Sequence, residues 1–466
     1  IEQAVYKEGL RFSRIGYDDN GAKKFQNIWP AAMLTYKGRS LPIQLLKSDS
    51  PDPTDEMING SINNLEYEMA ASMQLLLREF RPAIAILDGH RELLPVEMAD
   101  LELSLKDNYD VEHVTINGSI NALTEKLDNV KDRQLKYDLL IVAKPDSVFD
   151  NKDKLIIDQF IMNGGAVLWM VDPMLTDLDS LRVAQQTMAV TNEMGLYDML
   201  FDYGVRMNRN LILDYNAAPI VYDTGPRGNQ RGMEVFRWYF APIVLTSDSA
   251  HPIAANLDPI HFDFVSSLDA VGENKKVKHT PLLQTSELSV ERKTPVRVHS
   301  GISEYQLDFF QNSPHQSFTV AMLLEGEFNS NFTGRIPDVI AQDPTIAFRE
   351  SSPFTRMIVI GDGDIARNKV MQGADGLTPI PLGYDRMAGR VIYDNKEFLL
   401  NAVNYLLNDT ELIAVRSRYI KLRKLNDADV TENRKMLQLA NTLVPILIIA
   451  ALGLILLWIR KRKYAR

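Results

Sequence analysis

The chain has 466 residues, about three times the roughly 150 residues of an average domain. With 45% hydrophobic and 24% charged residues it can bury a large core, which excludes wholesale disorder. The net charge of -10 argues against a nucleic-acid-binding face, so we expect no nucleic acid among the partners. Cysteine is absent, which excludes disulfides, thiolate metal sites and cysteine nucleophiles.

The N-terminal part predicts a hairpin followed by a long helix. The stretch AAMLTYKGRSLPIQLL (31–46) predicts a β-hairpin that turns at Lys37 and Gly38. A helix over 54–80 follows, because apolar residues recur there at spacings of three and four. This apolar stripe consists of Ile58, Ile62, Leu65, Met69, Met73, Leu76 and Phe80. It either packs on its own domain or forms the seam of a dimer, so self-association stays open.

Strands and helices then alternate. Strands are expected at 83–87, 109–116, 138–144, 166–171 and 205–214. Helices are expected at 93–106, 121–131, 151–163 and 179–203. Such alternation is typical of βαβ units, so we expect an α/β fold with a mainly parallel sheet.

The second half has a different pattern. A Gly/Pro/Arg-rich loop at 223–232 precedes a β-rich lobe over 235–335. The strand at 356–361 and the helix at 396–407 then return to the α/β pattern.

The C-terminal end predicts a membrane anchor. Leu439 to Ile459 are 21 residues without a charge, enough at about 1.5 Å per residue to cross about 30 Å of hydrocarbon. Pro445 and Gly453 are tolerated in a membrane helix, and Trp458 stands where an interfacial aromatic belongs. The alternative is a buried core helix.

A basic tail follows this stretch, with Arg460, Lys461, Arg462 and Lys463 at its start. Without the tail's five basic residues, residues 1–459 carry a formal charge of -15. The positive-inside rule predicts a cytoplasmic tail and a bulk in the periplasm, beyond the inner membrane. Since Ile1 is not a start methionine, we expect an upstream signal or second membrane helix outside this sequence.

These patterns predict eight segments. They are an N-terminal β-rich segment (1–53), a long amphipathic helix (54–80), an α/β domain (81–222), a β-rich lobe (235–335), a return to the α/β sheet (356–410), a juxtamembrane connector (411–438), a transmembrane helix (439–459) and a cytoplasmic basic tail (460–466).

Acidic residues follow several expected strands. The candidate ligand-binding residues are Asp88, His90, Glu92, Asp172, Asp362 and Asp364. The carboxyl ends of strands in an open parallel sheet are where ligands bind, so these groups could converge on a hard cation or a polar ligand. The alternative is that Asp and Gly simply favour turns and helix N-caps there.

No catalytic constellation is apparent. The GDGDIA stretch (361–366) has the GxGxxA spacing of a dinucleotide site, but Asp362 and Asp364 would repel a pyrophosphate. Neither a GxxxxGK[ST] loop nor a GxSxG elbow occurs. We therefore expect no enzyme activity, no cofactor and no resident metal.

Several stretches together resemble the GldG-like family, gliding-motility-associated auxiliary (substrate-binding-like) components of an ABC transporter. The matching stretches are INGSINNLEYEMA (58–70), AILDGHRELLP (85–95), IDQFIMNGGAVLWMVDP (157–173), HPIAANLD (251–258), PLLQTSELS (281–289), VAMLLEGEFNSNF (320–332), VIGDGDIARN (359–368), NKEFLLNAVNYLLND (395–409) and LIAVRSR (412–418). They run nearly the whole length in the expected order.

The resemblance implies an exported domain beside an ABC permease subunit and a separate ATPase subunit, with an α/β part similar to the class I glutamine amidotransferase fold. The absence of cysteine means that amidotransferase activity does not carry over. The protein would bind a ligand or an envelope partner. An alternative is a stand-alone glycan- or peptidoglycan-binding envelope protein with Trp238 and Tyr239 as its platform, unless these two pack in the core.

Overall fold

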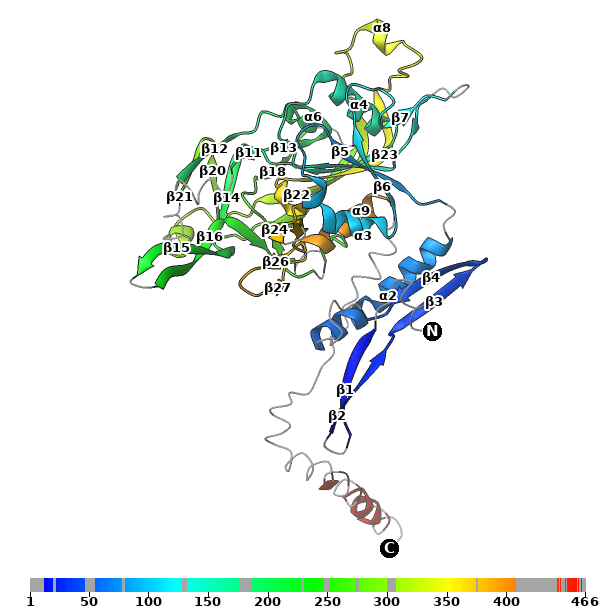
Figure 1. Ribbon diagram of the computed structural model, residues 1–466, viewed down its shortest axis with the longest axis vertical. Coiled ribbons are helices and arrows are strands. Elements are labelled where there is room, and N and C mark those ends of the chain that lie inside the picture. The colour runs from blue at the N-terminus through cyan, green and yellow to red at the C-terminus, as the bar shows by residue number, and fades with distance from the viewer. Residues whose placement is uncertain are drawn as a thin grey trace. The chain divides into compact units, whose positions relative to one another are not determined.

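The computed structural model (Figure 1) divides the chain into two compact units, Ile1–Arg418 and Tyr419–Arg466. In the first unit the structure describes residues 12–19, 22–46, 55–77, 80–127, 132–176, 186–227, 230–246, 251–255, 257–272, 276–299, 307–373 and 376–407. In the second it describes residues 442–443, 445, 449, 451–458, 460 and 462.

A seven-stranded mixed sheet forms the centre of the first unit. Its strand order is β19 (Val277–Gln284), β22 (Thr319–Asn329), β23 (Ser351–Ile360), β10 (Ala166–Met170), β9 (Leu139–Ala143), β5 (Ala83–Asp88) and β6 (Asp110–Thr115). The five strands from β23 to β6 run parallel to one another. β22 pairs antiparallel with β23, and β19 pairs antiparallel with β22.

Helices cover both faces of this sheet, so its central strands are buried on both sides. Ile84 and Ile86 of β5 belong to the core beneath α3 (Ala99–Lys106) and α9 (Asn395–Leu406). Ala85 and Leu87 of the same strand belong to the opposite core, beneath α4 (Asn151–Met162) and α6 (Tyr197–Tyr203). This explains the continuous apolar runs of β5, β9 and β10, since a strand buried on both faces shows no polar alternation.

Short strands build a third core beside the sheet. It contains Trp238 and Phe240 of the long β16 (Gln230–Val244), together with residues of α7 (Leu307–Gln311). The strands that form small sheets in this region are β11 (Met174–Leu175), β12 (Gln186–Thr191), β13 (Val205–Met207), β14 (Asn210–Asp214), β15 (Ala217–Arg227), β17 (Ile260–His261), β18 (Leu268–Ala270), β20 (Ser289–Lys293) and β21 (Val296–His299).

Smaller elements connect these parts. They are β7 (Thr124–Glu125), β8 (Gln134–Leu135), α8 (Asp338–Ala341), the 3₁₀ turns η1 (Pro95–Glu97) and η3 (Asp364–Ala366), and the hairpins β24 (Val370–Gly373) with β25 (Gly376–Pro379) and β26 (Tyr384–Asp385) with β27 (Arg390–Val391).

The N-terminal hairpin and helix are confirmed. β3 (Ala31–Tyr36) and β4 (Arg39–Gln44) pair antiparallel around Lys37 and Gly38, which both have positive φ. A further hairpin of β1 (Ser13–Asp19) and β2 (Ala22–Ile28) precedes them. The helix α2 (Asp55–Leu77) contacts β3 and β4.

The apolar stripe of α2 is only partly covered. Leu76 is buried, whereas Ile62, Leu65 and Met73 remain exposed. The structure therefore shows part of the stripe packed on its own hairpin, and self-association stays a prediction.

Three sequence-based element assignments are wrong. Residues 121–127 form turns and β7 instead of the start of a helix. Of the helix expected at 179–203, residues 186–191 form the strand β12 and 197–203 form α6, whereas 179–185 lie outside the described residues. The expected loop at 223–232 belongs to the β15–β16 hairpin, apart from residues 228–229, which lie outside the described part. The β-branched and aromatic residues of β12 and of the arms of this hairpin favour strands over the helix and the loop.

The expected fold class also needs correction. The sheet is mixed instead of mainly parallel, and two strands of the expected β-rich lobe, β19 and β22, belong to it. The physical reason is that their apolar faces join the same two cores as the parallel strands. Many short strands surround the sheet, and the likeness to the class I glutamine amidotransferase fold is not supported.

The C-terminal transmembrane helix is not supported either. None of the helices among the described residues is long and apolar enough to cross a membrane.

The residues expected in the anchor and tail are only partly described. Pro445, Gly453 and Trp458 are helical, and Trp458 lies under the guanidinium of Arg462, 4.3 Å from its ring centroid. Arg460 is also helical. Leu439, Lys461, Lys463 and the connector 411–438 lie outside the described residues.

A buried carboxylate links α4 to the loop after β22. Asp158 of α4 is fully buried, and its Oδ1 accepts hydrogen bonds from Tyr203 Oη at 2.8 Å and from the Asn331 backbone N–H at 2.9 Å. Its Oδ2 accepts from Ser330 Oγ at 2.7 Å. Burial raises the pKa of Asp158, and these donors oppose that shift. The carboxylate thus satisfies donors that no water reaches.

Replacing Asp158 should therefore destabilise the fold. We expect Asp158→Ala to lower the free energy of unfolding by about 3 kcal/mol, because several buried donors lose their acceptor. Asp158→Asn keeps one acceptor oxygen and should cost less. Urea denaturation measures both, with Glu287→Ala, at an exposed position, as the control. Equal stability of Asp158→Ala and the control would contradict this account.

Candidate functional site

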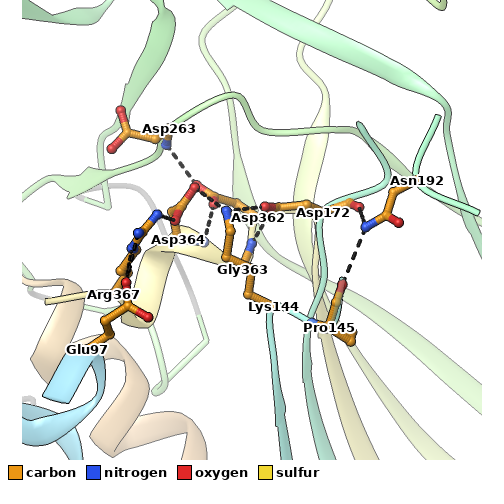
Figure 2. Close-up of polar contacts among 10 residues, drawn as sticks. All are labelled: Glu97, Lys144, Pro145, Asp172, Asn192, Asp263, Asp362, Gly363, Asp364 and Arg367. Atoms are coloured by element: carbon orange, nitrogen blue, oxygen red, sulfur yellow. Dashed lines mark hydrogen bonds and ion pairs between the residues drawn. The ribbon is translucent and has the colours of Figure 1, made fainter. Parts of the chain in front are cut away.

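Three of the predicted site residues come together at the carboxyl edge of the sheet (Figure 2). Asp172 lies two residues after β10, and Asp362 and Asp364 follow β23, which is the parallel neighbour of β10. On the other side of β10, Lys144 directly follows β9. Parallel strands end at the same edge, so the topology itself brings these four side chains together.

Lys144 binds two of the carboxylates. Its Nζ lies 2.5 Å from Asp172 Oδ2 and 2.5 Å from Asp364 Oδ2. The second oxygen of Asp172 accepts a hydrogen bond from the Gly363 backbone N–H. We call Lys144, Asp172, Asp362 and Asp364 the strand-end cluster. It ties the ends of β9, β10 and β23 together by charge.

The glycines of GDGDIA are explained by close packing in this cluster. A Cβ on Gly363 would lie 2.6 Å from Lys144 Cβ, and one on Gly361 would lie 2.2 Å from the Ser266 carbonyl oxygen. Both contacts are shorter than any real Cβ contact, so these positions exclude a side chain. The two glycines of the GxG spacing therefore allow Lys144, at the end of β9, and Ser266 to pack directly against this backbone.

Asp362 is the most deeply buried member of the cluster. Its Oδ1 accepts from the Asp364 N–H at 2.7 Å and its Oδ2 from the Asp263 N–H at 2.8 Å. Burial raises the pKa of Asp362 well above its usual value, and the charges of Asp172, Asp364 and Asp263 add to this. The pKa of Asp364 is also raised by burial, against the opposing charge of Lys144.

The lysine itself stays a cation. Burial disfavours its charge, but the carboxylates of Asp172 and Asp364 outweigh this and raise the pKa of Lys144 above its usual value. A protonated amine is neither a nucleophile nor a base. Chemically, the strand-end cluster is therefore one ammonium among three carboxyl groups, and its lysine is not available as a nucleophile or a base.

Two neighbours extend the cluster. Arg367 donates to Glu97 Oε1 from Nε at 2.9 Å and to Asp364 Oδ1 at 3.3 Å. On the other side, Asn192 Nδ2 donates to the carbonyl oxygens of Pro145 and Asp172, both at 3.3 Å. These bonds join η1 and the chain after β12 to the strand ends (Figure 2).

His90 and Glu92 belong to a second cluster. His90 Nε2 lies 3.1 Å from Asp153 Oδ2, and Nδ1 lies 3.3 Å from Glu92 Oε1. The imidazole stacks on Phe149 with ring centroids 3.7 Å apart and planes 7° apart. The other oxygen of Asp153 accepts from the Gly118 N–H at 2.8 Å. This buried group fixes the loop after β5 to the start of α4.

Asp88 pairs elsewhere, with the edge strand β6. Its Oδ2 lies 3.0 Å from His113 Nδ1, and His113 Nε2 lies 3.3 Å from Glu102 Oε2 of α3. Glu102 also binds Lys106 Nζ at 2.6 Å. Burial opposes protonation of His113, but Glu102 and Asp88 outweigh it and raise the imidazole pKa.

The six predicted residues thus separate into three groups. Asp172, Asp362 and Asp364 come together, His90 and Glu92 form another pair, and Asp88 joins His113. Among the described residues there is no group of three or more His, Asp or Glu side chains placed to hold a metal ion. In the strand-end cluster, Lys144 supplies the positive charge in place of a cation.

Sequence reasoning missed the partners of these acids: Lys144, Asp153, His113, Glu102 and Arg367. For Lys144 a signal exists, since DLLIVAK places a lysine at the end of an apolar strand beside other strands that end in acids. The other four partners come from different elements. The sequence of one segment does not show which element will pack against it.

The aromatic pair expected as a glycan platform lies in the third core. Trp238 is 1% exposed and Tyr239 is 5% exposed. Tyr239 packs on Phe310 with ring centroids 4.8 Å apart. Neither ring presents a face to a sugar.

Replacing Lys144 should reveal the charge balance of the strand-end cluster. We expect Lys144→Met to lower the free energy of unfolding by about 3 kcal/mol at pH 7.5, since it leaves buried carboxylates uncompensated. The pKa values of Asp362 and Asp364 are higher in the folded protein than their usual value of 3.8. Protonation of these carboxyl groups therefore stabilises the fold fully below about pH 3.8, and this contribution is lost as the pH rises through the folded pKa values. The deficit should therefore shrink at pH 5. Urea titrations at both pH values, with exposed Lys152→Met as the control, measure it, and a deficit independent of pH would contradict this balance.

His113 should give the edge strand a pH dependence. Because its folded pKa lies above the unfolded value of 6.5, its contribution is full below pH 6.5 and is lost as the pH rises through the folded pKa. We expect His113→Gln to be less stable than the native chain by about 0.5 kcal/mol at pH 6, after allowing for screening by water, and nearly equal at pH 9. Thermal unfolding at both pH values tests this, with exposed His315→Gln as the control. A difference that grows toward pH 9 would contradict it.

Comparison with known proteins places the chain among transport components. An uncharacterized protein of Borreliella burgdorferi is 23% identical over 412 residues, which cover 86% of this chain and 70% of the relative. Among solved structures, the mmIFT52 N-terminal domain aligns with 70% of this chain and 97% of its own, at 11% identity and a TM-score of 0.36.

The family model described as "ABC-type uncharacterized transport system" matches residues 81–402, well over half of the chain. This range holds all members of the strand-end cluster and the strands that carry them. The family consists of auxiliary components of ABC-type transport systems, which have partners in a transporter complex. The protein belongs to this family of ABC-type transport system auxiliary proteins.

Proposed function

We propose that this auxiliary protein is a non-enzymatic subunit that binds an ABC permease subunit and a separate ATPase subunit. The observation that carries the non-enzymatic part is the state of Lys144. At the edge of the sheet where α/β proteins place their reactive groups, this lysine is held between Asp172 and Asp364. Both oxygens of Asp362 are likewise occupied by backbone donors.

The sequence supports the same conclusion from another side. The chain contains no cysteine, so thiol chemistry is excluded at every position. A strand edge whose lysine is bound by two carboxylates suits a protein that holds a shape for its partners. Membership in the ABC-type transport system family supports an auxiliary role in transport.

We propose further that the transport complex supports gliding motility and that the α/β unit acts on the periplasmic side of the inner membrane. The support is the resemblance of stretches such as AILDGHRELLP (85–95) and VIGDGDIARN (359–368) to the GldG-like family. On this proposal the protein binds a ligand or an envelope partner and couples it to the permease.

Copurification tests the partners. A tagged chromosomal copy of the full chain, extracted in mild detergent, should bring down one permease and one ATPase subunit, identified by mass spectrometry. The untagged strain is the control. Deletion of the gene should abolish spreading on agar. A lone protein in detergent, together with intact motility in the deletion strain, would overturn the proposal.

Cysteine labelling tests the side of the membrane. Val339 is 84% exposed on α8, so Val339→Cys adds one reachable thiol to a chain that has none. A membrane-impermeant maleimide should label it in intact cells. Ala254→Cys, at a fully buried position, is the matched control. Labelling of Val339→Cys only after lysis would place this unit on the cytoplasmic side.

A further inference from the structure

A cavity of about 380 Å³ lies at the opposite edge of the sheet, where the parallel strands begin. Residues 80–82, which lead into β5, form one wall, and Leu406 and Leu407 at the end of α9 form another. Ala166, the first residue of β10, and the β23 segment 354–356 also line it. Its volume lies within the range of about 300 to 1,000 Å³ that small-ligand sites occupy.

Arg81 brings an uncommitted positive charge to this cavity. In the described part of the chain its guanidinium makes one hydrogen bond, from NH1 to the Lys106 carbonyl oxygen at 3.4 Å, and no carboxylate lies within ion-pair distance. The other guanidinium in the wall, that of Arg356, already binds Glu325 Oε1 at 3.1 Å. Arg81 is therefore the group in the wall that is ready for an added anion.

Two phenyl rings supply an apolar surface to the cavity. Phe80 is 85% exposed and Phe354 is 61% exposed, although most large apolar side chains of the described sheet strands are buried. The Phe354 ring is held in place by the Arg356 guanidinium, 5.4 Å from its centroid. Exposed aromatic rings beside a hollow are surface that a ligand can cover.

Asp138 limits the charge that the cavity can accept. Its Oδ2 accepts the Ala83 N–H at 2.9 Å, which fixes a carboxylate in the wall. A ligand with several negative charges would be repelled by it. A ligand with one carboxylate can bind Arg81 by charge-assisted hydrogen bonds and turn its apolar part to the rings.

We propose that this cavity binds an apolar monocarboxylate, with its carboxylate on Arg81 and its apolar body against Phe80 and Phe354. Such a group occurs both as a free organic acid and as the C-terminal residue of a peptide. This inference goes beyond the proposed function, since it concerns a bound ligand and stands whether or not the permease and ATPase copurify.

A ligand-observed NMR titration of the full chain tests the site. The probes are N-acetylphenylalanine, its neutral amide, and an alanine tripeptide extended by a C-terminal phenylalanine. The two carboxylates should bind saturably, with a Kd on the order of a millimolar for probes of this size, and the amide at least fivefold more weakly. A tighter Kd for the peptide points to a peptide terminus as the source, and a tighter Kd for N-acetylphenylalanine points to a free acid.

Variants separate the two halves of the site. Arg81→Gln should weaken the acids about tenfold and leave the amide unchanged, whereas Phe354→Ala should weaken all three probes. Both positions are exposed, so neither change threatens folding. Arg206→Gln is the matched control, because Arg206 is an exposed arginine that stacks on an exposed Phe201 elsewhere. Equal binding of acid and amide, no saturable binding, or an Arg81→Gln titration like that of the control would each overturn the proposal.

Discussion

The contact between the Lys144 ammonium and the carboxylates of Asp172 and Asp364 decides what the carboxyl edge of this sheet can be. The ends of β10 and β23 would otherwise place carboxylates side by side at low dielectric, which costs free energy unless a cation or a proton intervenes. Lysine provides that cation from within the fold. The glycines at 361 and 363 exist at this edge because Lys144 and Ser266 approach too closely for any side chain.

This solution has a chemical consequence for the family member described here. In α/β proteins the carboxyl edge commonly holds the reactive groups. Here the carboxyl oxygens at the same edge are bound by Lys144, by Arg367 or by backbone donors. The lysine at this edge is thereby engaged by carboxylates in a protein of an ABC-type transport system family.

The sequence predicts the individual strands and helices of this protein better than it predicts which elements lie next to each other. Doubly buried strands such as β5 and β9 are evident as apolar runs, and the α2 stripe is evident from its spacing. The direction of β22 is not, because an antiparallel neighbour has the same apolar run as a parallel one. The acids Asp172, Asp362 and Asp364 could be placed at one edge from their positions after strands. The sequence does not show which of these acids binds Lys144, nor that Asp88 pairs with His113. Both contacts depend on the strand order, which no single segment encodes.

The cavity at the amino edge has a further consequence. The segment from α2 enters the sheet at Pro82, and the chain leaves α9 at Leu407, and both residues line the same hollow. A pull on either end of the chain would thus act on a residue that lines the cavity. A shift of either attachment point would therefore change the lining of the cavity.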